Sequence, residues 1–167
     1  MRCRSAGFTL VEMIVTVSVL AILTSIGMQA YQSVVTSTRM SGRINSLLGT
    51  FALARSEAMK RGQTVNVCPV LSPSAATAAC TTVTDWTTGW VVLPTSAAPT
   101  PLQISTALTS GDTLTSTVNT FPVFSQTGYT FFAGTLSLRD KDNTPSLTRC
   151  IVFAAGSWST KKGAACI

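Results

Sequence analysis

The side chains that could do chemistry in this 167-residue chain are few. There are six acids, twelve Lys and Arg residues and no histidine. Without histidine, Ser–His and Cys–His nucleophile systems and a Cys₂His₂ zinc site are excluded. The acids include no pair placed for general acid–base work, and no Gly-rich phosphate loop follows an expected strand. The sequence therefore predicts a protein that is not an enzyme and uses no cofactor.

The cysteines fall into a distinct pattern. Cys3 lies near the amino end, and the other four form two local pairs, Cys68 with Cys80 and Cys150 with Cys166. An even set beyond an export signal indicates an oxidising compartment and disulfides. Three connectivities are allowed, and we favour 68–80 and 150–166 because each would close a loop. A Cys₄ zinc site is the alternative.

Glu12 lies where an acid is least expected, inside the apolar run Phe8–Met28. A helix needs about 20 residues to cross the hydrocarbon core, so this run can span a membrane. The leader, residues 1–7, contains Arg2 and Arg4 and would stay on the cytoplasmic side. A central acid costs roughly 2.5–3.5 kcal/mol in a membrane and usually has a partner.

Cleavage after Gly7 would supply such a partner. Phe8 would then carry the new α-amino group, and Glu12 of a neighbouring subunit could pair with it. The alternative is that Glu12 reaches the membrane interface and is stabilised by its own helix N-terminus.

The string from Gly7 to Glu12, GFTLVE, resembles the class III signal of type IV pilins and type II secretion pseudopilins. The resemblance implies cleavage by prepilin peptidase between Gly7 and Phe8 and N-methylation of Phe8. It also implies that Glu12 is the carboxylate used in assembly with other major and minor pilins.

Residues 29–62 read as an amphipathic continuation of the same helix. One apolar face repeats with a period near 3.6, and it consists of Met40, Ile44, Leu47, Leu48, Phe51, Ala54 and Ala58. Polar residues are expected on the opposite side, namely Arg43, Ser46, Thr50, Glu57 and Lys60. Glu57 and Arg61 form an i,i+4 pair, and Gly62 is suited to end the helix. The sequence predicts one helix from Phe8 to Arg61.

Residues 63–167 are rich in Thr, Ser and Val, with Pro and Gly between the apolar runs, which indicates strands. The expected strands are Thr64–Val70, Gly89–Leu93, Leu102–Ala107, Thr113–Val118, Phe121–Phe124, Tyr129–Phe132, Thr135–Arg139 and Arg149–Ala154. An antiparallel sheet on one face of the long helix gives an α+β fold.

Two further motifs have plain structural readings. Trp86 and Trp90 could stack a sugar or a base, but aromatic residues at strand starts are more typical of core anchors. Asp140–Asn143 begins like a calcium loop, but Pro145 and Ile151 stand where an EF-hand requires Gly and Glu. We expect a polar turn there and no metal.

Three later stretches, Leu53–Gly62, Thr64–Pro69 and Asp85–Val92, resemble the FimT/GspH family of minor pilins. The resemblance implies the pilin fold and a minor type IV pilin that initiates or caps pilus assembly, with a tip position and a role in natural transformation. A minor pseudopilin of type II secretion is the alternative. The family resemblance also implies a single-pass inner-membrane protein with a periplasmic globular domain, residues 63–167, that enters the extracellular pilus.

The carboxyl-terminal residues raise a third function, DNA binding. Residues 62–138 contain no Lys or Arg, so most of the net charge of +6 lies on the helix and in the last thirty or so residues. DNA-uptake members of the family carry a Gly-Arg-x-Arg motif here. This chain matches Gly156 but has Ser157 and Ser159 at the arginine positions.

Cations and an aromatic residue nevertheless lie near that motif. Lys161 and Lys162, with Trp158 and Arg149, could bind phosphates and stack a base, and they are our candidate DNA-binding residues. The alternative is a set of solvated cations on an exported surface.

Overall fold

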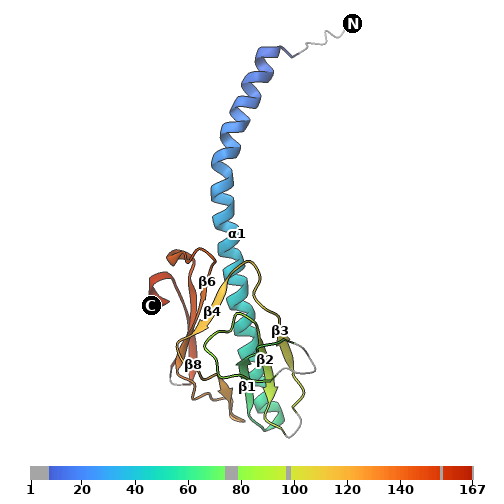
Figure 1. The fold of residues 1–167 in the computed structure, drawn as a ribbon, viewed down its shortest axis with the longest axis vertical. Coiled ribbons are helices and arrows are strands. Elements are labelled where there is room, and N and C mark those ends of the chain that lie inside the picture. The colour runs from blue at the N-terminus through green and yellow to red at the C-terminus, as the bar shows by residue number, and fades with distance from the viewer. Residues whose placement is uncertain (1–7, 74–78, 97–98, 155, 167) are drawn as a thin grey trace. The chain divides into compact units, whose positions relative to one another are not determined.

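The structure, a computed structural model, describes residues 8–73, 79–96, 99–154 and 156–166 (Figure 1). The chain forms two compact units, one ending at Ser37 and the other starting at Thr38. The helix α1 (Leu10–Arg61) forms the first unit and continues into the second. All the strands belong to the second unit, which we call the head.

Local chemistry sets both ends of α1. The Thr9 hydroxyl accepts a hydrogen bond from the Glu12 backbone N–H at 3.2 Å, which is the first half of a capping box. At the other end Gly62 adopts a φ of +63°, and the Gln63 N–H bonds to the Ala58 carbonyl at 3.3 Å. This is the Schellman pattern that glycine permits. The helix therefore begins two residues after the expected Phe8 and ends at the expected Arg61.

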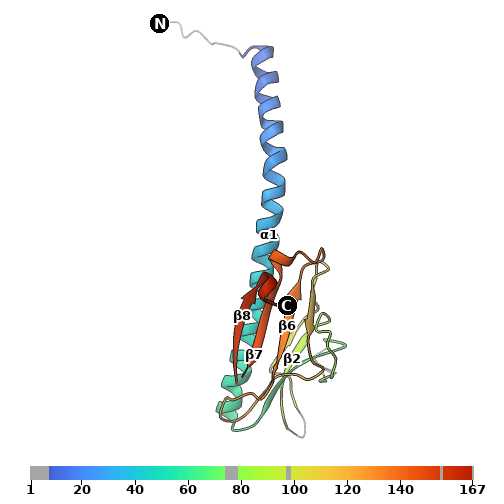
Figure 2. The same cartoon turned by 90° about the vertical axis from the view of Figure 1, so that its left-hand side faces the viewer.

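The head contains two four-stranded antiparallel sheets, so the expected α+β pilin fold is confirmed (Figures 1 and 2). The first sheet has the order β3-β2-β1-β5 and consists of β1 (Val65–Pro69), β2 (Trp90–Pro94), β3 (Gln103–Ser105) and β5 (Val123–Phe124). The second has the order β4-β6-β7-β8 and consists of β4 (Thr113–Ser116), β6 (Gly134–Arg139), β7 (Arg149–Ala154) and β8 (Ser157–Lys162). Two 3₁₀ turns, η1 (Pro145–Leu147) and η2 (Gly163–Cys166), flank the last two strands.

The predicted apolar stripe of α1 forms the centre of the head. Its members Met40, Ile44, Leu47, Phe51, Ala54 and Ala58 are buried, and Leu48 is partly buried. Phe51 lies at the middle of an aromatic cluster, with ring centroids 5.0 Å from Phe153, 6.1 Å from Trp158 and 6.3 Å from Phe124. Such tilted and edge-on contacts each contribute about 0.5–1.5 kcal/mol beyond burial.

Three expectations about local structure were wrong. Thr50 does not lie on the exposed face of the helix: it is 1% exposed. The Trp90 indole N–H donates to its hydroxyl at 3.3 Å, and that hydroxyl donates to the Ser46 carbonyl, so its polar group is satisfied inside the core. Tyr129–Phe132 is not a strand, because only Thr130 makes a bridge, to Phe124.

The third difference is the strand β8, which was not among the expected strands. Its residues Ser157–Lys162 pair along their whole length with β7. Polar side chains occupy most of β8, so the apolar alternation that marks a strand is missing from its sequence.

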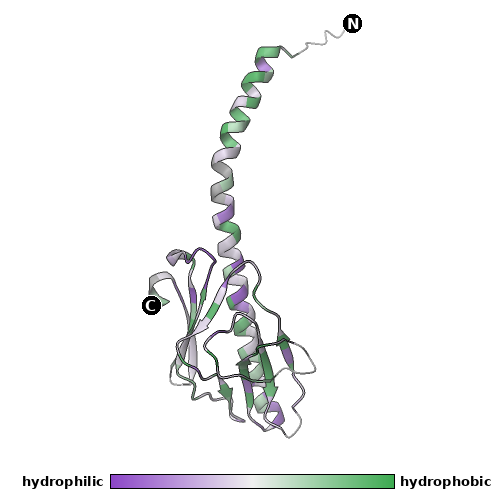
Figure 3. Cartoon of the chain, in the orientation of Figure 1, coloured by the Kyte–Doolittle hydropathy of each residue, from purple (hydrophilic) through white to green (hydrophobic). Residues whose placement is uncertain are grey.

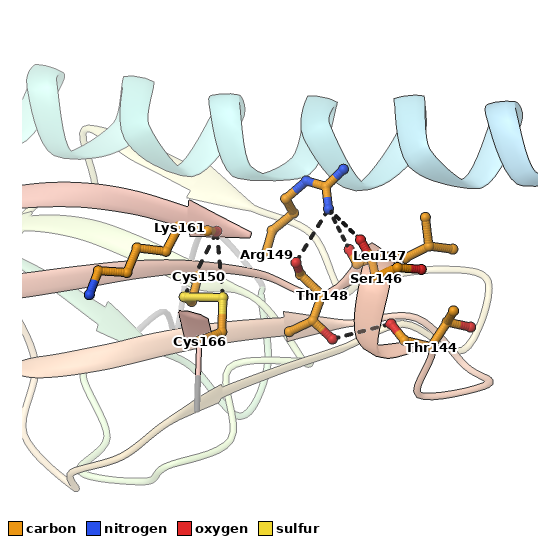
Figure 4. Close-up of a disulfide and its surroundings, with 8 residues drawn as sticks. All are labelled: Thr144, Ser146, Leu147, Thr148, Arg149, Cys150, Lys161 and Cys166. Atoms are coloured by element: carbon orange, nitrogen blue, oxygen red, sulfur yellow. Dashed lines mark hydrogen bonds between the residues drawn. A yellow bond between two sulfur atoms is a disulfide. The ribbon is translucent and has the colours of Figure 1, made fainter. Parts of the chain in front are cut away.

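The cysteine pairs are the two that we favoured. Cys68 bonds to Cys80 with a Cα–Cα distance of 5.2 Å. Cys150 bonds to Cys166 with a Cα–Cα distance of 5.6 Å (Figure 4). The four sulfurs are therefore used in disulfides rather than in a zinc site. The bridges span 12 and 16 residues. Loops of that length correspond to about 3 kcal/mol of stabilisation each in the chain-entropy account.

Candidate functional site

Glu12 occupies the first turn of α1, on an exposed and apolar surface. Its neighbours Phe8, Leu10 and Val11 are 74%, 76% and 68% exposed. Apolar residues predominate along this end of the helix (Figure 3). Glu12 is exposed as well. Within the described chain nothing buries this surface, and an exposed apolar surface of this kind marks a protein–protein or membrane contact.

Gly7, the residue expected to precede the cleavage point, lies outside the described residues. Within the part of the chain that the structure describes, no helix is both long enough and apolar enough to cross a membrane.

An ion pair that the sequence did not reveal ties α1 to the head. The Arg39 guanidinium donates to both carboxylate oxygens of Asp112, at 3.0 and 2.8 Å. The Asp112 side chain is fully buried, and Arg39 retains 29% exposure. Arg43, one turn later, donates to the Thr109 hydroxyl at 3.0 Å. The two arginines hold the loop before β4 against the helix.

The predicted Glu57–Arg61 pair is confirmed, with the Arg61 Nε 2.6 Å from Glu57 Oε2. The hydrogen bond from Arg61, and the nearby Lys60, hold the pKa of Glu57 below its usual 4.5. This pair stabilises the last turn of the helix and takes part in no site.

The four candidate DNA-binding residues occupy different environments. Lys161 and Lys162 are exposed on β8. Trp158 is partly buried and packs on the core, with Arg55 lying 6.0 Å over its ring. Arg149 is only 9% exposed. Trp158 and Arg149 therefore have structural roles, and DNA binding stays a prediction.

Arg149 secures the chain where η1 leads into β7 (Figure 4). Its Nη1 donates to the carbonyl oxygens of Ser146, Leu147 and Thr148, at 3.3, 3.0 and 3.3 Å. The same residue lines a cavity of about 260 Å³ together with Lys161 and Lys162 of β8. The remaining lining residues are Ser41, Ile44, Asn45 and Thr160. The structure thus gathers three of the predicted cations at one place between α1 and the edge of the second sheet.

Trp86, Trp90 and Asp140 have the structural roles that the sequence favoured. Trp86 and Trp90 are 0% and 2% exposed and belong to the core. Asp140 accepts hydrogen bonds from the Thr144 N–H and hydroxyl at 2.8 and 2.9 Å, which makes a polar turn. Among the described residues, no three metal-binding side chains lie together.

Gly156, the matched residue of the Gly-Arg-x-Arg motif, has a steric role. It adopts a φ of +80° in the turn between β7 and β8, and the Tyr129 ring lies directly against it. A Cβ at this position would come within 2.0 Å of Tyr129 Cε2. Tyr129 also contacts Phe131, whose side chain is 87% exposed, with ring centroids 4.8 Å apart.

The fold is similar to those of two solved minor filament subunits. The type IV minor pilin FimU of Pseudomonas aeruginosa strain PAO1 matches with a TM-score of 0.58 at 15% identity, over 74% of this chain and 89% of FimU. The minor pseudopilin EpsH from the type 2 secretion system of Vibrio cholerae matches with a TM-score of 0.51 at 17% identity, over 71% and 92%. No curated protein sequence matches significantly. The fold is that of a pilin-like subunit.

Matches to two sequence families specify which kind of pilin-like subunit this is. The prokaryotic N-terminal methylation motif matches residues 2–28, and the family described as type II transport protein GspH matches residues 43–157. The second match spans more than half of the chain. The protein belongs to the GspH family and is a minor pilin or pseudopilin of that type. The family and the two solved relatives are structural subunits rather than enzymes.

Proposed function

We propose that this protein is a minor subunit that initiates or caps a type IV pilus, at or near the tip, and joins it through Glu12. The observation that carries the proposal is an exposed carboxylate in the first turn of a helix whose neighbouring apolar residues are also exposed. Such a surface becomes buried when subunit helices assemble side by side.

Burial makes the charge of Glu12 decisive. An uncompensated carboxylate in an apolar bundle is costly, whereas one paired with a cation is not. Cleavage after Gly7 by prepilin peptidase provides the cation as the α-amino group of Phe8 on an adjacent subunit. N-methylation of that amine leaves it basic. Glu12 then selects the axial position at which the subunit enters the filament.

Before assembly, Phe8–Met28 holds the subunit in the inner membrane, with the head in the periplasm. The two disulfides of the head fit that oxidising space. The methylation motif over residues 2–28 supports the same location.

The experiment compares Glu12→Ala with the parent chain expressed at equal levels in cells that assemble the filament. We expect the variant to stay in the membrane fraction and its incorporation into sheared filaments to fall at least tenfold. Thr16→Ala is the matched control, because Thr16 bonds only its own helix, at the Met13 carbonyl. Undiminished incorporation of Glu12→Ala would remove the assembly role.

A pseudopilus of type II secretion is the second candidate, favoured by the match to EpsH. Deletion of the chain separates the two. Loss of surface pili with normal protein secretion supports the pilus, and loss of secretion with normal pili supports the pseudopilus.

A further inference from the structure

We propose that the outer edge of β8 receives an added β-strand from a partner protein, and that this strand carries two consecutive acidic residues opposite Lys161 and Lys162. The inference is independent of the role of Glu12 and of filament assembly.

The two sheets have four edges in the described chain, and β8 forms the longest uncovered one. The edge at β4 is covered, because the Trp86 backbone N–H donates to the Leu114 carbonyl and the Ser116 backbone N–H donates to the Thr84 carbonyl. β3 and β5 are only three and two residues long. β8 has six residues, a length of about 20 Å, and within the described chain it pairs only with β7.

An uncovered strand of this length is a template for another strand. Its unpaired backbone N–H and C=O groups offer a row of hydrogen bonds, and proteins usually block such edges. The only blocking groups on β8 are the two lysines at its end. Their positive charge attracts a strand that places acids directly opposite them.

The side chains of β8 alternate between the two faces of the sheet. Trp158 packs on the core, so Thr160 and Lys162 lie on the same face, toward α1, and Lys161 lies on the opposite face. An incoming strand must place one acid on each face, at successive positions. Directly opposed residues on adjacent strands have Cβ atoms about 4.5–5.5 Å apart, so each lysine can reach its acid.

A cavity of about 260 Å³ lies beside the edge, between α1 and β8. Its lining includes the cations Arg149, Lys161 and Lys162 and the polar residues Ser41, Asn45 and Thr160. A carboxylate entering on this side meets cationic groups and neutral hydrogen-bonding groups. Within the described residues neither lysine forms an ion pair, so none of the described acids of the head competes with the incoming strand.

The test uses the full chain in detergent micelles and a capped peptide, EEVTVT, whose acids meet the lysines in antiparallel pairing. The expected result is slower amide exchange along Ser157–Lys162 on addition of the peptide. Methylation of alternate peptide nitrogens should abolish the effect, because a strand pairs through its backbone. KKVTVT should give no protection.

The variant Lys161→Gln/Lys162→Gln should weaken EEVTVT binding about tenfold. Lys141→Glu changes the net charge by the same amount at an exposed turn and should leave binding unchanged. Three results would overturn the proposal: no protection of β8 by EEVTVT, equal binding of the N-methylated peptide, or stronger protection by a duplex DNA of equal charge. The last would make this edge a nucleic-acid site instead.

Discussion

Arg39 and Asp112 are 73 positions apart in the chain, yet they form a two-pronged ion pair in which the aspartate is fully buried. The pair joins α1 to the loop that leads into β4. It lies at the start of the head, where the packed part of the helix begins. A charge in that position is tolerated only because both of its oxygens are engaged.

Replacing Arg39 should therefore lower the stability of the head markedly. We expect Arg39→Ala to lower the free energy of unfolding by about 3 kcal/mol, because it leaves Asp112 buried and unpaired. Arg43→Ala is the matched control: Arg43 makes one exposed hydrogen bond, and its loss should cost under about 1 kcal/mol. Urea unfolding of the full chain in micelles measures both. Equal losses for the two variants would show that the pair does not stabilise the head.

Gly62 is needed for its backbone conformation alone, whereas Gly156 is needed for its backbone conformation and for lack of space. Both have positive φ, of +80° and +63°, but only Gly156 has a ring against it. Gly62→Ala should cost about 1 kcal/mol from backbone strain alone. Gly156→Ala should cost clearly more, because Tyr129 must move, and adding Tyr129→Ala should restore part of the difference. Equal stability of the two glycine variants would show that the Tyr129 ring does not constrain position 156.

The Cys150–Cys166 bridge should stabilise the edge of the second sheet. Replacing both cysteines with alanine is expected to cost about 3 kcal/mol and to speed amide exchange along β8, which lies within the closed loop. The same replacement at Cys68 and Cys80 should cost a similar amount but leave exchange in β8 unchanged. If both double variants loosen β8 equally, the bridges act on the whole head and not on one edge.

The helix C-terminus should respond to acid through Glu57. Its folded pKa is lowered, chiefly by the hydrogen bond from Arg61. Its contribution is therefore present above the unfolded pKa, near 4.5, and is lost as the pH falls through the lower folded value. Glu57→Gln should flatten the fall in stability below about pH 4.5, measured by unfolding of the parent and the variant over a pH series. An unaltered curve for Glu57→Gln would contradict the role of this pair.

The sequence predicted best where the physical signal is local and periodic. The stripe from Met40 to Ala58 was evident because a period of 3.6 is visible in a single helix. The cysteine pairs were favoured because each closes a short loop. β8 was missed because Ser, Thr and Lys occupy most of its positions, and only the pairing with β7 makes it a strand. The Arg39–Asp112 pair was missed because no local pattern joins residues so far apart.

The candidate site likewise contains residues that the sequence could predict and others that it could not. Glu12 stands out in the sequence because an acid in an apolar run is unusual, and its role as an N3 residue follows from Thr9 three positions earlier. Its proposed partner belongs to another subunit, so it can be seen neither in the sequence nor in the fold of one chain. The cations on β7 and β8 were identified from the sequence, but the sequence did not show that Arg149 is buried while Lys161 and Lys162 are exposed. That Arg149 secures η1 depends on where three carbonyl groups converge.

The most direct test of the central claim is the incorporation of Glu12→Gln into filaments. Glutamine can also serve at the N3 position of a capping box, so this variant keeps the helix start and removes only the charge. We predict that Glu12→Gln is incorporated at no more than about one tenth of the parental level, with the head intact. Incorporation of Glu12→Gln at the parental level would show that Glu12 acts as a helix cap and not as an assembly charge.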